Sequence, residues 1–297
     1  MQPALRSRQR VRPNGQIRRA VATLLVLWLC LLSVACSNTF LYNQLDWLIP
    51  WYVDDYVDLD RGQRRDFRAR LRELQRWHRG EELVRYVAFL DSVDADLDRT
   101  LTGADIEAWA NALEDAYDRL EAKMLPIAFR LGGDLSDEQM AAFLENLADE
   151  QSELEEEYLQ RSDEEYREDA EESLRDAFED VVGRLDREQI LAIEEAVVQL
   201  ERFDTAWLDE RAQWLQTLGE LLQREPGWEA AIREALANRE RNRTDSYRRA
   251  YNHNAVIVNQ VIADVLNLRS AKQDARLRDE IADFRRDFRK LIAQGSA

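Results

Sequence analysis

Few side chains in this sequence are suited to catalysis. Histidine, the usual acid–base group near neutral pH, occurs only at His78 and His253. A serine nucleophile would need one of them as its base, and neither lies in a recognisable motif. The sequence has no Glu-x-x-His pair for a di-iron centre, no His-Glu-x-x-His zinc motif and no glycine-rich phosphate loop. We therefore expect no enzyme, no cofactor and no small-molecule substrate.

One acidic segment resembles a calcium loop. In "DADLDRTLTGAD", residues 94–105, oxygen-bearing side chains fall on loop positions 1, 3, 5, 7 and 12, namely Asp94, Asp96, Asp98, Thr100 and Asp105. Position 6 should be glycine for the sharp turn and is Arg99, and position 12 should be glutamate and is the shorter Asp105. We expect the end of one helix here, followed by the start of another at Thr102, and keep a metal site as the alternative.

Cysteine chemistry points to the N-terminus. Six arginines without an acid precede the apolar run at residues 20–32, which is too short to cross a bilayer and is typical of a secretory signal. The following residues 33–36, Ser-Val-Ala-Cys, resemble a bacterial lipobox, although Leu32 lies one place further from Cys36 than the pattern prefers. The resemblance implies removal of residues 1–35 and acylation of Cys36, which would anchor the protein firmly. The alternative is an ordinary signal peptide with a chance cysteine.

The lipobox resemblance also implies a location. An aspartate after the cysteine would retain such a lipoprotein at the inner membrane, and Ser37 stands there instead. We therefore expect the outer membrane, with the protein facing the periplasm. Cys30 leaves with the signal, so the mature chain would hold no disulfide.

Charge excludes one class of partner. Without residues 1–35, 35 basic side chains face 59 acidic ones. A protein this acidic is repelled by phosphate backbones and anionic lipids, so we expect no nucleic acid partner and attachment to the membrane through the lipid.

The elements that must position these residues are helices. Glycine and proline are scarce, and a pentad recurs as "LDRGQ" (59–63), "LSDEQ" (135–139) and "LDREQ" (185–189), with looser copies "LTGAD" (101–105) and "RSAKQ" (269–273). Each predicts a capping box, in which the second residue caps the helix and the fifth reaches back to it. The caps are Asp60, Thr102, Ser136, Asp186 and Ser270. A further start is expected at Pro226. We predict an all-α, irregular multi-helix bundle or array.

Two family resemblances follow from these motifs. The pentads are similar to the L-T-x-x-Q motif of Spy/CpxP-type periplasmic chaperones. The lipobox, the segments "YNQLDWLIPWYVDDYVDLD" and "LQRWHRGEELVRYVAFLD" and the pentads together resemble a family of proteobacterial lipoproteins of unknown function. This second resemblance spans nearly the whole mature chain and implies a helical envelope lipoprotein without implying an activity.

The segment behind Cys36, residues 36–60, combines aromatic and acidic side chains, and we name it the collar. We expect Leu41, Leu45, Leu48, Trp51, Tyr52 and Tyr56 to form one face of a helix, interrupted at Pro50, that docks onto the body. The alternatives are a place among lipid headgroups, which the aspartates oppose, and a surface for a helical partner. Trp47, Trp51, Tyr52 and Tyr56 are the candidate interaction residues.

Three further sets of polar residues stand out in the sequence. Residues 149–172 hold 13 acids and are expected to be mainly a solvated face, with weak binding of cations or basic proteins as the alternative. Arginines between 233 and 249 are expected to pair with that stretch, in the same molecule or a neighbour. Asn252, Asn254, Asn259 and Asn267 are expected to bind neighbouring backbone or to fix the register between helices.

We expect three parts: a signal peptide (1–35), the collar (36–60) and a single helical body (61–297). The function predicted is that of a lipid-anchored interaction or scaffold module with an unidentified protein partner. The alternative is a chaperone-like binder of unfolded envelope proteins.

Overall fold

The computed structural model describes residues 38–295, and all regular secondary structure in that range is helical, which confirms the all-α prediction. The signal peptide and Cys36 lie outside the described residues. The helices are α2 (Asn38–Asn43), α3 (Leu45–Val53), α4 (Arg61–Trp77), the π-helical η1 (His78–Glu82), α5 (Leu83–Asp96), α6 (Gly103–Asp134), α7 (Asp137–Leu159), α8 (Asp163–Val182), α9 (Arg187–Gln199), α10 (Asp204–Leu221), α11 (Trp228–Asn242), α12 (Asp245–Asn267) and α13 (Ala271–Gly295).

The pentads begin helices, as predicted. The boxes at Asp60, Thr102, Ser136 and Asp186 are complete capping boxes that start α4, α6, α7 and α9. The Ser270 box makes the same two bonds at the start of α13. A sixth box, Ser162 with Glu165, starts α8; it was not predicted because its pentad, RSDEE, has neither the leading leucine nor the closing glutamine of the others. The expected start at Pro226 is displaced: α11 begins at Trp228, after Gly227 at a φ of +94°.

The capping glutamines also bind one another across the fold. Gln63 and Gln139 each donate Nε2 to the other's Oε1 at 2.9 Å. The same Nε2 atoms donate to backbone carbonyls just before the opposite cap, Gln63 to Asp134 at 2.7 Å and Gln139 to Asp58 at 2.6 Å. Each Oε1 still accepts from its own cap. The starts of α4 and α7 are thereby joined in a nearly symmetric arrangement that we name a glutamine clasp.

A second glutamine clasp joins α9 to α13. Gln273 donates to Gln189 Oε1 at 2.9 Å and to the Arg184 carbonyl at 3.0 Å, and Gln189 donates to the Val265 carbonyl at 3.1 Å. Gln189 is fully buried and Gln273 nearly so. Because a buried amide is costly unless its groups are paired, these bonds make the register between the two helices specific.

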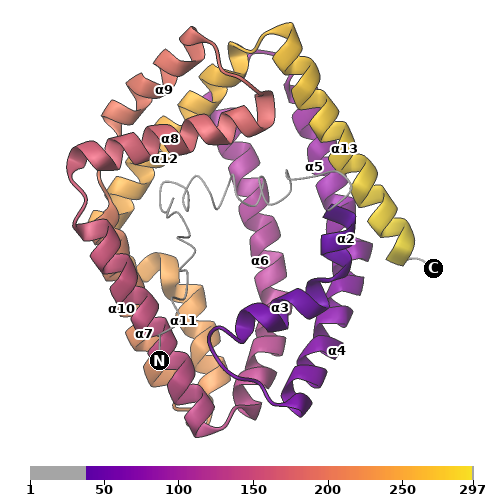
Figure 1. Ribbon diagram of the computed structural model, residues 1–297, viewed down its shortest axis with the longest axis vertical. Helices are drawn as coiled ribbons and strands as arrows, with labels where there is room; N and C mark the ends of the chain where they lie inside the picture. Colours follow the sequence, from indigo (N-terminus) through magenta and orange to yellow (C-terminus); the bar gives the residue numbers. More distant parts are fainter. Residues whose placement is uncertain (1–37, 296–297) are drawn as a thin grey trace, which may run out of the picture.

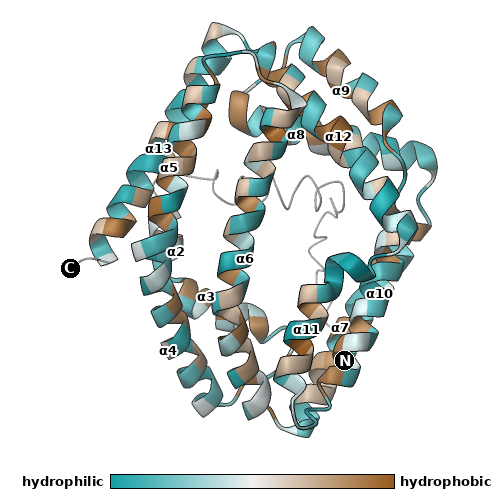
Figure 2. Cartoon of the chain, turned by 180° about the vertical axis from the view of Figure 1, so that it is seen from behind, coloured by the Kyte–Doolittle hydropathy of each residue, from teal (hydrophilic) through white to brown (hydrophobic). Residues whose placement is uncertain are grey.

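Each clasp belongs to one of two main hydrophobic cores. The first core contains residues of α5, α8, α9, α12 and α13 and the first turns of α6, with Leu174, Ile193, Leu277 and Ile281 almost inaccessible. The second contains residues of α4, the C-terminal half of α6, the start of α7, the end of α10 and α11, with Leu71 at its centre. Figure 2 shows the matching pattern, in which hydrophobic bands interrupt largely hydrophilic helices.

Long helices connect the two cores and give the molecule the form of a frame (Figure 1). α6 has 32 residues and contributes to both cores. At 1.5 Å per residue it spans about 48 Å. On the other side α7 packs against α10, where Leu154, Tyr158 and Leu208 form a small cluster, and α10 meets α12 through Phe203 and Tyr247.

The collar docks onto the body, but through a different face from the one predicted. The packed residues are Tyr42, Ile49 and Val53, whereas Trp51 and Tyr52 are 60% and 57% exposed. The helix breaks at Gln44, between α2 and α3, while Pro50 lies inside α3. Because the break comes six residues earlier than expected, the two segments do not share the single continuous stripe that the spacing suggested.

The first glutamine clasp predicts that removing the amide donor of Gln139 lowers the stability of the protein. We predict that Gln139→Glu destabilises the protein by about 1–3 kcal/mol, because the carboxylate still accepts from the Ser136 cap but donates neither to Gln63 nor to Asp58. Urea unfolding monitored by circular dichroism measures the change.

The matched control is Glu165→Gln, at a capping box of the same type whose glutamate is exposed and makes no clasp. This control should leave the unfolding free energy unchanged. Equal effects of the two substitutions would mean that the glutamines act as caps alone.

Candidate functional site

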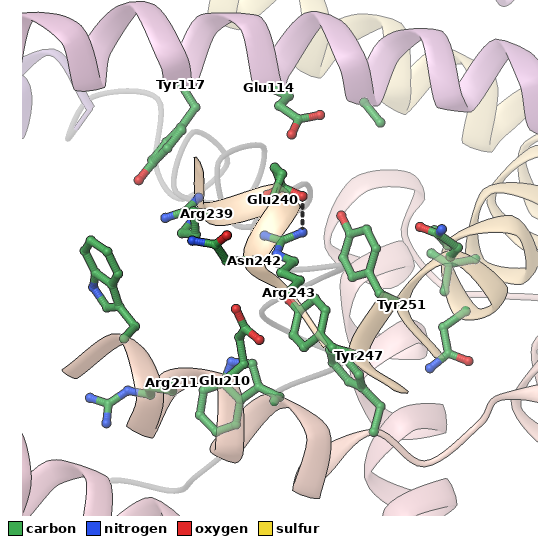
Figure 3. A pocket seen from close by; sticks show the side chains of 18 of the residues that line it. Glu114, Tyr117, Glu210, Arg211, Arg239, Glu240, Asn242, Arg243, Tyr247 and Tyr251 are labelled. Atoms are coloured by element: carbon green, nitrogen blue, oxygen red, sulfur yellow. Dashed lines mark ion pairs between the residues drawn. The ribbon is translucent and has the colours of Figure 1, made fainter. Parts of the chain in front are cut away.

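A cavity of about 1230 Å³ lies inside the frame, between the two cores. Its walls come from the N-terminal half of α6, most of α10, the C-terminal half of α11 and the first two thirds of α12. Figure 3 shows Glu114 and Tyr117 pointing from α6 toward Arg239 and Glu240 of α11, with Tyr247 and Tyr251 of α12 on a third side. Segments more than 100 residues apart in the chain therefore meet around one space.

The lining combines aromatic side chains with charges of both signs. The aromatic residues are Tyr117, Phe203, Trp207, Trp214, Tyr247 and Tyr251. The charged residues are Glu107, Glu114, Glu210 and Glu240 with Arg211, Arg239 and Arg243. Aromatic residues and arginine are the types most enriched in the buried centres of protein interfaces.

Arg243 organises one wall of the cavity. Its guanidinium pairs with Glu240 at 2.6 Å and lies over the rings of Tyr247 and Tyr251, 4.8 and 5.7 Å from their centroids. The two tyrosines stack, with centroids 5.9 Å apart and ring planes at 12°. A cation held over two rings by its own carboxylate presents a rigid, partly apolar surface.

The tyrosines of the cavity act as neutral groups. Burial raises the pKa of Tyr117, Tyr247 and Tyr251 above the ordinary value, and for Tyr251 the nearby Glu114 raises it further. Their hydroxyls can therefore donate and accept hydrogen bonds at physiological pH.

The asparagines of α12 divide into two groups. Asn254 binds the backbone of Glu201 and Asn267 that of Leu101, both through donor and acceptor, as the sequence predicted. Asn252 and Asn259 line the cavity, as Asn254 also does, and their amides add further polar groups there.

The candidate interaction residues of the collar occupy two environments. Trp47, Trp51 and Tyr52 are exposed. Tyr56 is half-buried against Phe143, and its hydroxyl lies 3.1 Å from that of Tyr52. Burial, followed by the bond to Tyr52, raises the pKa of Tyr56 well above its usual range.

The acidic residues of the calcium-like segment are engaged by arginines. Asp94 pairs with Arg278 and Arg285, and Asp98 with Arg278. Arg99, which occupies the position of the loop glycine, pairs with Asp96 and Asp105. Asp105 also accepts from Thr102, so the segment ends α5 and starts α6 as expected. A cation here would have to displace these guanidinium groups.

The acidic stretch and the arginine cluster use different partners from those expected. Arg211 pairs with Glu150, Arg202 with Asp163 and Arg161 with Asp169. In the cluster, Arg233 pairs with Glu229, Arg243 with Glu240 and Arg248 with Asp245. These three partners of the cluster lie one helical turn away, so their pairing needs no long-range closure.

The cavity itself was missed by the sequence analysis. Each wall contributes only a few residues, and along one helix these resemble an ordinary amphipathic surface. The signal that could have indicated it is the density of tyrosine and arginine around residues 239–251.

A polar junction holds the collar to the body. The hydroxyl of Tyr42 lies 3.0 Å from His78 Nδ1, and Gln75 donates to the Tyr42 carbonyl at 2.6 Å. His78 begins η1, whose last residue, Glu82, is fully buried between Arg85 and Arg119. Burial lowers the pKa of His78 to about 4, so the imidazole is neutral above that pH.

The fold is an all-helical frame with a cavity between two hydrophobic cores. The chain belongs to a family of unknown function (DUF6279), whose model matches residues 55–248. The match includes both pentads of the first clasp and most of the cavity lining. No curated protein and no solved structure gives a significant match. Within residues 38–295, the helices lack the combined length and hydropathy required to cross a bilayer.

The junction predicts a dependence of stability on pH. The pKa of His78 is about 4 in the folded state and about 6.5 when unfolded, so protonation favours unfolding. Stability should fall as the pH drops from about 6.5 to about 4, by about 1–3 kcal/mol from this group.

His78→Gln keeps a polar side chain but does not titrate in this range. The difference in unfolding free energy between wild type and His78→Gln, measured by urea unfolding at several pH values, should therefore shift across that window. Parallel pH profiles would contradict the assignment.

Proposed function

We propose that this protein is a lipid-anchored module of a bacterial envelope that binds a segment of a partner polypeptide in its central cavity. The anchor is the acyl group expected on Cys36, and the expected location is the periplasmic face of the outer membrane. The observation that carries the binding proposal is the cavity of about 1230 Å³ with its aromatic and charged walls.

The size of the cavity favours a polypeptide. Sites for small molecules usually have volumes of roughly 300–1,000 Å³ and mostly apolar walls. This cavity is larger and mixes six aromatic residues with four acids and three arginines. Neutral phenols and amides such as Asn259 can bond to main-chain groups, and the rings can cover apolar side chains.

Rigidity also supports this proposal. Each wall helix is anchored in a hydrophobic core, α6 in both, α12 in the first, and α10 and α11 in the second. Arg243 is held in place by Glu240 and two rings. A preformed site loses less conformational entropy on binding than a flexible one, so it can hold a short segment with useful affinity.

A chaperone-like binder of unfolded envelope proteins is the second candidate. The same mixture of rings and both charge signs would suit many sequences in turn, and the pentads are similar to those of periplasmic chaperones. The two functions differ in selectivity: a module has one defined partner, whereas a chaperone contacts many clients and suppresses their aggregation.

Photo-crosslinking in the cell tests the proposal with a matched pair of positions. Val256 lines the cavity and is 69% exposed, and Val198, on α9 and absent from the lining, is 72% exposed. With benzoylphenylalanine at each position, we predict one discrete adduct at Val256 and none at Val198, identified by mass spectrometry.

Tyr247→Ala together with Tyr251→Ala should abolish the Val256 adduct. A continuous range of adducts at Val256 would favour the chaperone, which is then checked by suppression of aggregation of an unfolded outer-membrane protein at stoichiometric amounts. Equal labelling at both positions would contradict a role for the cavity.

A further inference from the structure

Exposed apolar side chains gather on the collar. Phe40 is 67% exposed, Leu41 48%, Trp47 51%, Trp51 60% and Tyr52 57%. These five residues, which we name the aromatic patch, lie within 13 positions of sequence. Across the described residues, the other seven large hydrophobic side chains with comparable exposure are scattered from position 84 to 268. Exposed apolar side chains concentrated in one short segment mark a candidate interaction site.

The position of the patch limits what can cover it. Phe40 follows the proposed acylation site, Cys36, by four residues. At about 3.3–3.6 Å per extended residue, that spacer reaches about 14 Å at most. Phe40 must therefore lie close to the membrane surface whenever the acyl chains are inserted, and the rest of the patch follows within twelve residues. Tryptophan and tyrosine are the residues enriched at that depth, where a ring meets hydrocarbon and a polar edge meets water.

Ion pairs weaken the main objection to a membrane contact, because they engage two of the five collar aspartates, while Asp60 caps α4 and Asp55 and Asp58 remain exposed. Aspartates in the collar would be repelled by anionic headgroups if they were free. Asp46 instead pairs with Arg72 at 3.1 Å and Arg68 at 3.5 Å, and Asp54 pairs with Arg64. The two carboxylates are mostly covered, whereas the three arginine side chains remain 37–53% exposed. Beside the patch, the accessible members of these pairs are guanidinium groups, which bind phosphate well.

Net charge is distributed unevenly along the chain, and this difference bears on which part can approach a membrane. Residues 38–82, which form the collar, α4 and η1, contain nine acids and eight arginines. Residues 83–297 contain 50 acids and 27 basic residues. A negatively charged leaflet repels the second region far more strongly than the first. The nearly neutral segment is therefore the part of the chain that an anionic lipid surface repels least.

From these observations we infer that the aromatic patch inserts into the headgroup layer of the membrane that holds the protein. The inference rests on the proposed acylation of Cys36 and adds a second membrane contact. Because α3 crosses one broad face of the frame (Figure 1), this contact fixes the frame at the membrane surface. The cavity then has a defined height and orientation relative to the lipid.

Spin-label accessibility of the full mature protein tests the inference. Because Cys36 is acylated, a cysteine introduced by Tyr52→Cys is the only free thiol, and Val198→Cys provides a control of similar or greater exposure. Each variant is purified with its lipid, checked by mass spectrometry and reconstituted in vesicles of phosphatidylethanolamine and phosphatidylglycerol. Collisions of the nitroxide with oxygen, which concentrates in lipid, and with a water-soluble nickel chelate are then measured.

We expect the label at position 52 to show a higher oxygen-to-nickel ratio than the label at position 198. A label at 52 that is as open to nickel as the control would overturn the inference while leaving the anchor intact. Protection from both reagents would also overturn it, because a protein partner or a second copy would then cover the patch. A bare Cys36 would refute the proposed anchor and this inference together.

Discussion

This fold depends on the ability of the glutamine amide to accept one hydrogen bond and donate others at the same time. One side chain must accept from its own helix cap and donate to a second helix start. Gln63, Gln139, Gln189 and Gln273 meet both requirements and form clasps. Asp105 and Glu165 occupy the same position in their boxes but carry no donor, and neither forms a clasp. A local capping signal thus becomes a tertiary contact only where the fifth residue is an amide.

The two clasps explain why the helices form a frame. Each fixes a pair of helix starts inside its own core, and α6 connects the cores over a length that packing alone would not bridge. The space between them is bordered by paired charges, including Glu240 with Arg243 and Glu150 with Arg211. Collapse of the frame would require these groups to lose water without gaining better partners, which is unfavourable.

The sequence predicted those features that depend on neighbouring residues. Five helix starts are correct because a capping box involves residues three positions apart. The pairing of the boxes was not predictable, since Gln189 and Gln273 are 84 positions apart and the pentad alone does not specify a partner. The predicted collar face was wrong for Leu41, Trp51 and Tyr52, which are exposed. The helix breaks at Gln44, which carries no strong breaking signal, while Pro50 is accommodated within α3. The cavity could not be predicted, because no single helix contains its pattern.

Hydrogen exchange at the helix starts tests the role of the clasps most directly. The backbone amides of Gln139 and Glu165 are both capped by serine at 3.2 Å, and only Gln139 belongs to a clasp. If the clasps hold the frame together, Gln139 should exchange only on global unfolding, while Glu165 exchanges faster through local fraying. Equal, fast exchange at the two amides would show that the clasp does not stabilise the frame and would contradict this account.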